Sequence, residues 1–276
     1  MAVSTYTTIT KDKRTDPMNE SPAGPQGLRA ANAVTKEQKK QAKLDKELAR
    51  LKSMWDAEHL LADGTRFVFG IDEAGRGPLC GPVVAGCCIL PPDAGILWLN
   101  DSKKLSESRR EELYEEITRT AIAWGVGITG PERIDEINIL QATFEAMRQA
   151  FANCTEYYHS KHIDRLKAQG EELSMDVLDD IPSASDTLIL VDGNRMIPGL
   201  ELRQRAVIGG DAKCPSISAA SILAKVTRDR MMIAYDREYP QYGFAQHKGY
   251  GTKQHMDAIR SLGILPIHRR SFLKNL

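Results

Sequence analysis

Four carboxylates in this chain follow short apolar segments, in positions where they could share one site. They are Asp72, Glu73, Asp192 and Asp211. Each apolar segment has the length and composition of a buried strand, so the acids come where strands end. Consecutive strand residues face opposite sides of a sheet, so Asp72 and Glu73 can share a site only where their strand ends. If these strands belong to one sheet, four carboxylates meet at one edge.

A cluster of carboxylates needs cations, because like charges raise one another's pKa values. Carboxylate oxygens are hard ligands that suit Mg²⁺ or Mn²⁺. Two such ions roughly 4 Å apart can activate a water on one side of a phosphodiester and stabilise the leaving oxygen on the other. The pattern therefore indicates metal-assisted phosphoryl transfer or hydrolysis with two divalent ions. A turn is the competing explanation for Asp192 and Asp211 taken singly, whereas Asp72-Glu73 is harder to explain that way.

The glycine-rich turn after Glu73 does not have the spacing of a dinucleotide-binding loop. Gly75 and Gly77 are followed by Gly81, which misses the G-x-G-x-x-G pattern. An apolar segment that begins at Pro82 comes next, where that motif requires a helix. A Gly-Arg-Gly turn instead allows the backbone to approach a ligand closely and offers its amides as donors.

The hydrophobic patterning predicts an α/β fold with a mixed sheet. Strands are expected over 67–71, 82–90, 121–128, 187–191 and 205–208, and helices over 106–118, 131–153 and 216–238. The order β-β-α-β-α-β-β-α does not alternate strictly, which excludes a doubly wound parallel sheet.

The chain divides by composition into four regions. We expect a disordered tail over 1–34, a charged accessory helix over 35–64, a catalytic domain over 65–240 and a basic extension over 241–276. Within the catalytic domain, residues 155–186 are polar and acidic, which predicts a surface insertion. The accessory helix carries a sparse apolar stripe of Leu44, Leu48, Leu51 and Trp55. Docking on one side is the simpler interpretation of this helix, and a basic arm that touches nucleic acid is the alternative.

The 276 residues are 42% hydrophobic and 27% charged, with a formal net charge of zero. The charge is unevenly distributed, since residues 241–276 hold six Lys and Arg residues against a single acid, a local charge of +5. None of the five cysteines forms a C-x-x-C pair, which favours a reduced, cytoplasmic protein with neither a disulfide framework nor a structural zinc site. No apolar run approaches the length of a membrane span, and the N-terminus does not resemble a secretory signal.

Several segments, taken in order, resemble the ribonuclease HII family. The motifs are Gly-Ile-Asp72-Glu-Ala-Gly-Arg-Gly-Pro, Asp101-Ser-Lys-Lys-Leu, Val-Asp192-Gly-Asn, Ile217-Ser-Ala-Ala-Ser-Ile-Leu-Ala-Lys-Val-Thr-Arg-Asp229 and Tyr242-Gly-Phe-Ala-Gln-His-Lys-Gly-Tyr250-Gly-Thr. The resemblance runs from about Phe67 to Phe272. It implies a ribonuclease H-like sheet with a C-terminal helical extension. The sister family, ribonuclease HIII, carries an N-terminal domain with a sheet, whereas the Lys-, Glu- and Gln-rich N-terminal region here favours HII.

The resemblance implies an endoribonuclease that cuts the RNA strand of RNA–DNA hybrids. It would also nick on the 5′ side of single ribonucleotides in duplex DNA, leaving a 3′-hydroxyl and a 5′-phosphate. Asp72, Glu73, Asp192 and Asp211 would bind two Mg²⁺ or Mn²⁺ ions. Gly75, Arg76 and Gly77 would recognise the ribonucleotide 2′-OH, and Tyr250 would pack beside the following sugar. Ser102, Lys103 and Lys104 would lie near substrate phosphates. A monomer is expected.

Some residues and functions stay open at this point. Asp229 follows Lys225 and Arg228 on a predicted helix, where i,i+4 pairing explains it without a catalytic role. Lys225 could face phosphate or pair with a carboxylate. His247 and His268 lie among cations, which favours solvation or contact with a DNA backbone over metal ligation. The rival functions are a non-catalytic hybrid-duplex binder and a Mg²⁺-dependent nuclease for DNA junctions.

Overall fold

The computed structural model describes residues 25–169 and 182–274, and its centre is a five-stranded sheet in the order β3-β2-β1-β4-β5. The strands are β1 (Phe67–Ala74), β2 (Val83–Ile89), β3 (Ala123–Thr129), β4 (Thr187–Asp192) and β5 (Arg203–Val207). β1 pairs with β2 and β2 with β3 in antiparallel fashion, whereas β1–β4 and β4–β5 are parallel. The predicted mixed sheet and the predicted order of elements are confirmed.

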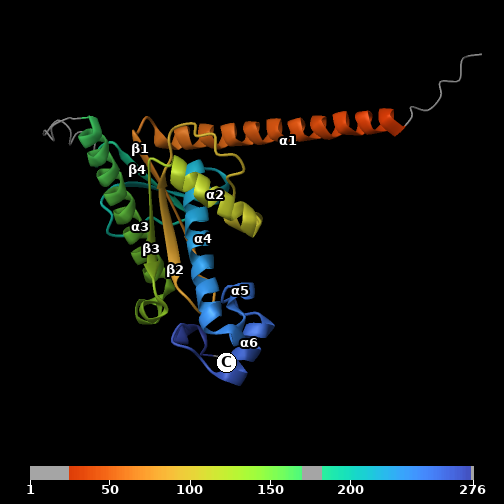
Figure 1. Cartoon of the computed structure of the whole chain (residues 1–276). Coiled ribbons are helices and arrows are strands. Elements are labelled where there is room, and N and C mark those ends of the chain that lie inside the picture. The colour runs from red at the N-terminus through yellow and green to blue at the C-terminus, as the bar shows by residue number, and fades with distance from the viewer. Residues whose placement is uncertain (1–24, 170–181, 275–276) are drawn as a thin grey trace, which may run out of the picture. The chain divides into compact units, whose positions relative to one another are not determined.

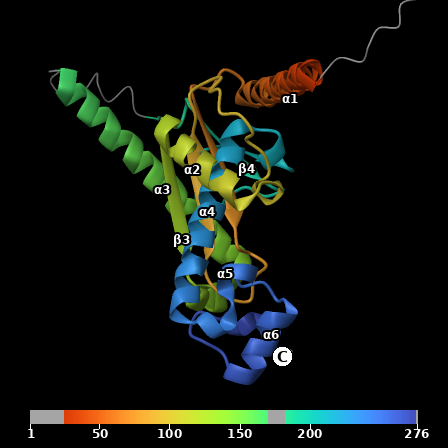
Figure 2. The same cartoon turned by 45° about the vertical axis from the view of Figure 1, so that its right-hand side comes forward.

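Helices cover both faces of this sheet. The described α-helices are α1 (Pro25–Ala62), α2 (Glu107–Thr120), α3 (Pro131–Gln169), α4 (Pro215–Glu238), α5 (Phe244–His247) and α6 (Lys253–Leu262). The sheet lies between α3 on one side and α4 with α2 on the other, and α5 and α6 gather at one end of α4 (Figures 1 and 2). Among the described residues, no helix combines the length and the apolar character that crossing a membrane requires.

The long helix α4 lies directly against the strands because glycines face it. A Cβ atom added at Gly70 would come 2.1 Å from the carbonyl carbon of Ser216, and one at Gly86 would come 2.2 Å from the carbonyl oxygen of Ala220. All residues of α4 from Pro215 to Ala224 are buried. The glycines therefore fix the first half of α4 against the middle of β1 and β2.

The C-terminal part of α1 belongs to the compact unit that runs from Lys46 to Leu276. Leu51 and Trp55 of the predicted stripe are buried, while Leu48 is 48% exposed. The Trp55 indole N–H donates to the carbonyl of Ala94 (3.1 Å). Glu58 accepts hydrogen bonds from both the backbone N–H and the hydroxyl of Ser216, each at 2.9 Å. A carboxylate thus caps the N-terminus of α4, where the helix has free N–H groups.

Two expectations about the chain's organisation were wrong in part. Helix α1 begins at Pro25, so residues 25–34 are helical and not disordered, while residues 1–24 lie outside the described part. Proline is favoured in a first helical turn, and the alanines after it favour a helix without an apolar stripe. Helix α3 continues to Gln169, because Tyr157 and Tyr158 pack against the core, so residues 155–169 are not an aperiodic insertion. Residues 170–181 of the expected insertion lie outside the described residues.

Glu58→Gln tests the buried cap of α4. Burial raises the pKa of Glu58 to about 7, although its hydrogen bonds to Ser216 oppose the shift. The folded state therefore holds a proton more tightly than the unfolded state, and this contribution to stability is complete below about pH 4.5 and is lost as the pH rises through 7. Glutamine keeps an acceptor oxygen and cannot ionise.

We expect the free energy of unfolding of Glu58→Gln, relative to wild type, to be higher at pH 8.5 than at pH 5 by ~2–3 kcal/mol. Urea denaturation at both pH values measures this difference. The exposed Glu37→Gln in the same helix serves as the control. An equal difference between variant and wild type at the two pH values would contradict the buried-cap account.

Candidate active site

The four predicted carboxylates come together where the parallel strands β1 and β4 stop pairing. The last paired residues are Ile71 and Val191, so Asp72 and Asp192 occupy the next positions on neighbouring strands. An Asp192 carboxylate oxygen accepts a hydrogen bond from the N–H of Gly210 (2.7 Å). This bond holds the 3₁₀ turn Gly210–Ala212, which carries Asp211, beside the end of β4. β1 itself runs to Ala74, so Asp72 and Glu73 lie within its last residues and not beyond them.

Burial and mutual repulsion raise the pKa values of three acids in this cluster. Burial raises the pKa of Asp72 well above its usual value, and the charges of Glu73 and Asp192 raise it further. Burial also raises the pKa of Glu73, although Arg76 opposes the shift through an ion pair. The pKa of Asp211 is raised to about 6 by burial and by the charge of Asp192. These acids therefore interact electrostatically, as groups at one site do.

Asp101 and Lys103 join the cluster from the 3₁₀ turn Ser102–Lys104. Burial opposes the charge of Lys103, but the neighbouring Asp72, Asp101 and Asp211 raise its pKa overall. Asp101 also acts on Asp211, through its charge and a side-chain hydrogen bond. Asp101 appeared in the sequence only as part of a motif. Its role at the site could not be inferred from spacing, since it is not at the end of a strand.

A pocket of 410 Å³ opens beside these acids. Predicted site residues that line it are Glu73, Gly75, Arg76, Gly77, Ser102, Lys103 and Tyr250. Tyr250 is 45% exposed, and a Cβ atom at Gly77 would lie 3.6 Å from its ring. Lys104 is not among the lining residues, and it pairs with Asp101 at 3.8 Å. The structure thus brings the turn, Ser102, Lys103 and the tyrosine into one pocket and leaves Lys104 at its margin.

Three basic residues of the pocket were not predicted as site residues. Arg110, Lys225 and Arg228 also line it. The buried Asp229 pairs with Lys225 (2.7 Å) and with Arg110 (3.4 Å), which agrees with the structural role expected for this acid. Lys225 pairs with a carboxylate, which is one of the two roles that the sequence left open, and it also borders the pocket.

The donor set of the carboxylate cluster fits divalent metal ions. All four donors are carboxylates, which are the ligands that Mg²⁺ and Mn²⁺ prefer. The raised pKa values of Asp72, Glu73 and Asp211 show that burial and repulsion penalise the ionised forms. A bound divalent cation would offset that penalty.

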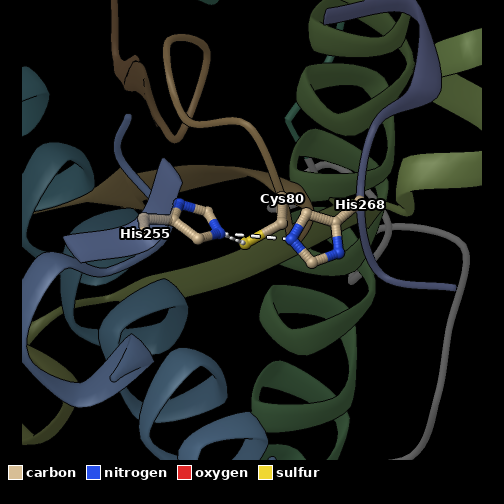
Figure 3. Close-up of side chains that lie close together, drawn as sticks. All are labelled: Cys80, His255 and His268. Carbon is tan, nitrogen blue, oxygen red and sulfur yellow. Dashed lines mark hydrogen bonds between the residues drawn. The ribbon is translucent and has the colours of Figure 1, made fainter. Parts of the chain in front are cut away.

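A second group of potential metal ligands, Cys80, His255 and His268, is buried away from the acids (Figure 3). Their ligand atoms lie within 4.8 Å of one another. The hydrogen bonds, however, account for both nitrogens of each imidazole ring. His268 Nδ1 accepts from the N–H of Leu265 (2.8 Å), so its Nε2 carries the proton and donates to His255 Nε2 (3.2 Å). His255 Nδ1 in turn donates to the carbonyl of Tyr250 (2.9 Å).

These hydrogen bonds are typical of packed side chains and not of a metal centre. A metal ion bound to His268 Nε2 would need the electron pair that the N–H bond of this nitrogen uses. Burial lowers the pKa of His255 and lowers that of His268 to about 4, so both rings are neutral near pH 7. The expectation that His247 and His268 are solvated or contact DNA was wrong, since both are buried. Their rings pack among Phe244 and His255, which the neighbouring cations in the sequence do not reveal.

Comparisons with known proteins agree on one family. The family model described as Ribonuclease HII matches residues 69–275. The chain is 49% identical to a ribonuclease HII of Clostridioides difficile over 213 residues, which are 77% of this chain and 72% of the relative. It is 46% identical to that of Acetivibrio thermocellus over 250 residues, or 90% and 86% of the two chains. The crystal structure of ribonuclease H2 from Pyrococcus horikoshii is similar, with a TM-score of 0.50 and 27% identity, and covers 74% of this chain and 93% of that one.

Gly75→Ala tests how tightly the glycine turn is held. Gly75 has φ = +96°, and an added Cβ would lie 2.1 Å from Nε of the buried Arg228 and 2.8 Å from the carbonyl oxygen of Pro82. Strain and overpacking together should lower the free energy of unfolding by ~2–4 kcal/mol. Gly64→Ala is a matched control, because Gly64 has φ = +74° with no atom within 4 Å of the added Cβ. That control should lose only ~1 kcal/mol. Urea denaturation of both variants measures these losses in the free energy of unfolding. Equal losses in the two variants would contradict the close packing of Arg228 on the turn.

Proposed function

Because the chain belongs to the ribonuclease HII family, we propose that its carboxylate cluster and glycine turn together cut a nucleic acid strand next to a ribonucleotide. The protein is an endoribonuclease that acts on RNA–DNA hybrids and takes part in removing ribonucleotides from DNA. The observation that carries the proposal is the position of the Gly75–Gly77 turn. It borders the same pocket as Glu73, which comes directly after Asp72.

The four carboxylates Asp72, Glu73, Asp192 and Asp211 would hold the divalent ions on which this family depends. Mg²⁺ and Mn²⁺ both suit these donors. When bound, two such ions supply an activated water and charge neutralisation at the leaving oxygen. Asp192 is held in place by the N–H of Gly210, and Asp72 by its position in the paired sheet. The scaffold thus keeps the ligand oxygens in fixed positions, as metal-assisted hydrolysis requires.

Basic residues of the chain would position the phosphates of the substrate. Lys103 lies at the edge of the acids, and Arg76 pairs with Glu73 at 3.3 Å with its side chain half exposed. A phosphate in the pocket would lie near Lys103 and Lys225, which line it together with Glu73. Such cations lower the repulsion between a polyanion and an acidic site.

Recognition of the ribonucleotide would come from the turn and from Tyr250. Backbone N–H groups of the turn can bind a 2′-OH, the group that distinguishes RNA from DNA. Tyr250 stands beside Gly77 and offers a flat apolar surface to the next sugar. Together they would select a junction of ribonucleotide to deoxyribonucleotide and place its phosphate at the acids. Hydrolysis on the 5′ side of the ribonucleotide would leave a 3′-hydroxyl and a 5′-phosphate.

Asp72→Asn should abolish cleavage of labelled duplex DNA that contains one ribonucleotide. The amide keeps the shape of the side chain and loses the charge that holds a divalent ion, so the rate should fall by at least ~10³-fold. Duplex binding should stay measurable by fluorescence anisotropy. The exposed Asp56→Asn, assayed beside it, should cleave at the wild-type rate. Full activity of Asp72→Asn would refute the proposed role of the cluster.

Tyr250→Ala should weaken selection of the junction more than it weakens folding. Loss of the contact between the ring and the sugar should cost about as much as loss of a contact between an aromatic ring and a base, ~1–3 kcal/mol. We therefore expect kcat/KM for a single embedded ribonucleotide to fall ~10-fold or more, and kcat/KM for a continuous RNA–DNA hybrid to fall less. The melting temperature reports on folding, and an unchanged ratio of the two kcat/KM values would count against the assigned role of Tyr250.

A further inference from the structure

The loop from Gly75 to Pro82 turns most of its carbonyl oxygens inward onto two buried arginines. Arg269 is 0% exposed and Arg228 is 1% exposed. The Arg269 guanidinium donates to the carbonyls of Gly75 (2.6 Å), Arg76 (3.1 Å), Pro78 (2.8 Å) and Gly81 (2.9 Å). The Arg228 guanidinium donates to those of Cys80 (3.1 Å) and Pro82 (3.0 Å), and to Lys248 (3.0 Å) beyond the loop. No described carboxylate forms an ion pair with either guanidinium at 4.0 Å or less, so their partners are mainly backbone dipoles.

Of the two arginines, only Arg269 binds carbonyls within the Gly75–Gly77 turn, and these are the carbonyls of Gly75 and Arg76. The loop carbonyls that Arg228 binds come after the turn, at Cys80 and Pro82. In a planar trans peptide the C=O and N–H groups point in opposite directions. The carbonyl of Gly75 shares its peptide plane with the N–H of Arg76, and that of Arg76 shares its plane with the N–H of Gly77. Both N–H groups are therefore directed away from Arg269.

Gly75, Arg76 and Gly77 line the pocket, whereas the buried Arg269 is not among its lining residues. From this geometry we propose that Arg269 is a positioning residue for ribonucleotide recognition: its guanidinium fixes two peptide planes so that the N–H groups of Arg76 and Gly77 face the 2′-OH. The inference rests on the proposed function of the turn. Arg269 does not touch the substrate and acts only through the backbone that it holds.

The segment that carries Arg269 is itself fixed at several points. The N–H of Arg269 donates to the carbonyl of Leu79 (2.9 Å), and Cys80 and His268 form an isolated β-bridge. On the other side, Asp135 of α3 accepts hydrogen bonds from the N–H groups of Arg270 (2.8 Å) and Ser271 (3.0 Å). The C-terminal extension thus places the N–H donors of the Arg269 guanidinium beside a turn that lies nearly two hundred residues earlier in the chain.

Arg269→Lys tests whether the planar donor geometry of the guanidinium matters, and not only its positive charge. Lysine keeps the cation but cannot donate in one plane to four carbonyls. The readout is the ratio of two dissociation constants, for an all-DNA duplex and for the same duplex with one ribonucleotide, measured by anisotropy in EDTA so that no strand is cut. A fraction of unfolded protein changes both constants equally and leaves their ratio unchanged. The test requires that the wild-type protein binds the ribonucleotide duplex more tightly than the all-DNA duplex. A ratio of one in the wild-type protein would refute the proposed recognition of the ribonucleotide by the turn and would leave the role of Arg269 aside.

We expect Arg269→Lys to reduce the wild-type ratio by ~10-fold or more, because small displacements of recognition groups have effects of this size. Arg270→Lys is the matched control, since the Arg270 side chain is exposed and should leave the ratio unchanged. Should Arg269→Lys fail to fold, Asp135→Ala loosens the same segment from a less buried position and should lower the ratio in the same direction by a smaller factor. A wild-type ratio in folded Arg269→Lys, or in Asp135→Ala if that variant alone folds, overturns the inference.

Discussion

The parallel pairing of β1 with β4 is the constraint on which the rest of the site depends. It ends at Ile71 and Val191, so that Asp72 and Asp192 come next to each other on the two strands. Bringing acids together in this way is costly, because burial and repulsion both raise the pKa of Asp72. The fold tolerates this cost because the strands are anchored elsewhere, by α3 on one face of the sheet and by α4 on the other. A buried set of carboxylates that repel one another is a common feature of catalytic sites.

The proposed recognition of the substrate depends on a different kind of interaction. The acids are placed by strands, which are regular, whereas the Gly75–Gly77 turn is irregular and has few backbone partners of its own. Arg269 of the C-terminal extension donates to carbonyls of the turn, and Arg228 of α4 donates to carbonyls of the loop that follows it. Buried carbonyls left without partners would destabilise the loop by ~1–3 kcal/mol each. The extension therefore contributes to the site through buried contacts as well as through Tyr250.

Strand ends and short motifs were the parts of the structure that the sequence predicted well. Apolar segments located all five strands, and the acids at the ends of β1 and β4 came together as expected. The resemblance to the family selected the turn and Tyr250, which border one pocket. The roles of Arg228 and Arg269 could not be predicted, because a bond from a side chain to a distant carbonyl leaves no spacing in the sequence. The burial of His247 and His268 was also not predicted, because the cations near them in the sequence indicated exposure to solvent. The last turns of α3 were missed because their polar composition hid the two tyrosines that pack on the core.

Direct measurement of metal binding tests the central claim, that the carboxylates at the ends of β1 and β4 form one divalent-ion site. Mn²⁺ should be titrated by calorimetry into the wild-type protein and into Asp192→Asn, with the melting temperature followed in parallel. A ligand that binds the folded state raises its stability, so Mn²⁺ should raise the melting temperature of the wild type, and both the heat and the stabilisation should be reduced in the variant. Equal binding and equal stabilisation in the two proteins would contradict the account and would place the metal elsewhere in the molecule.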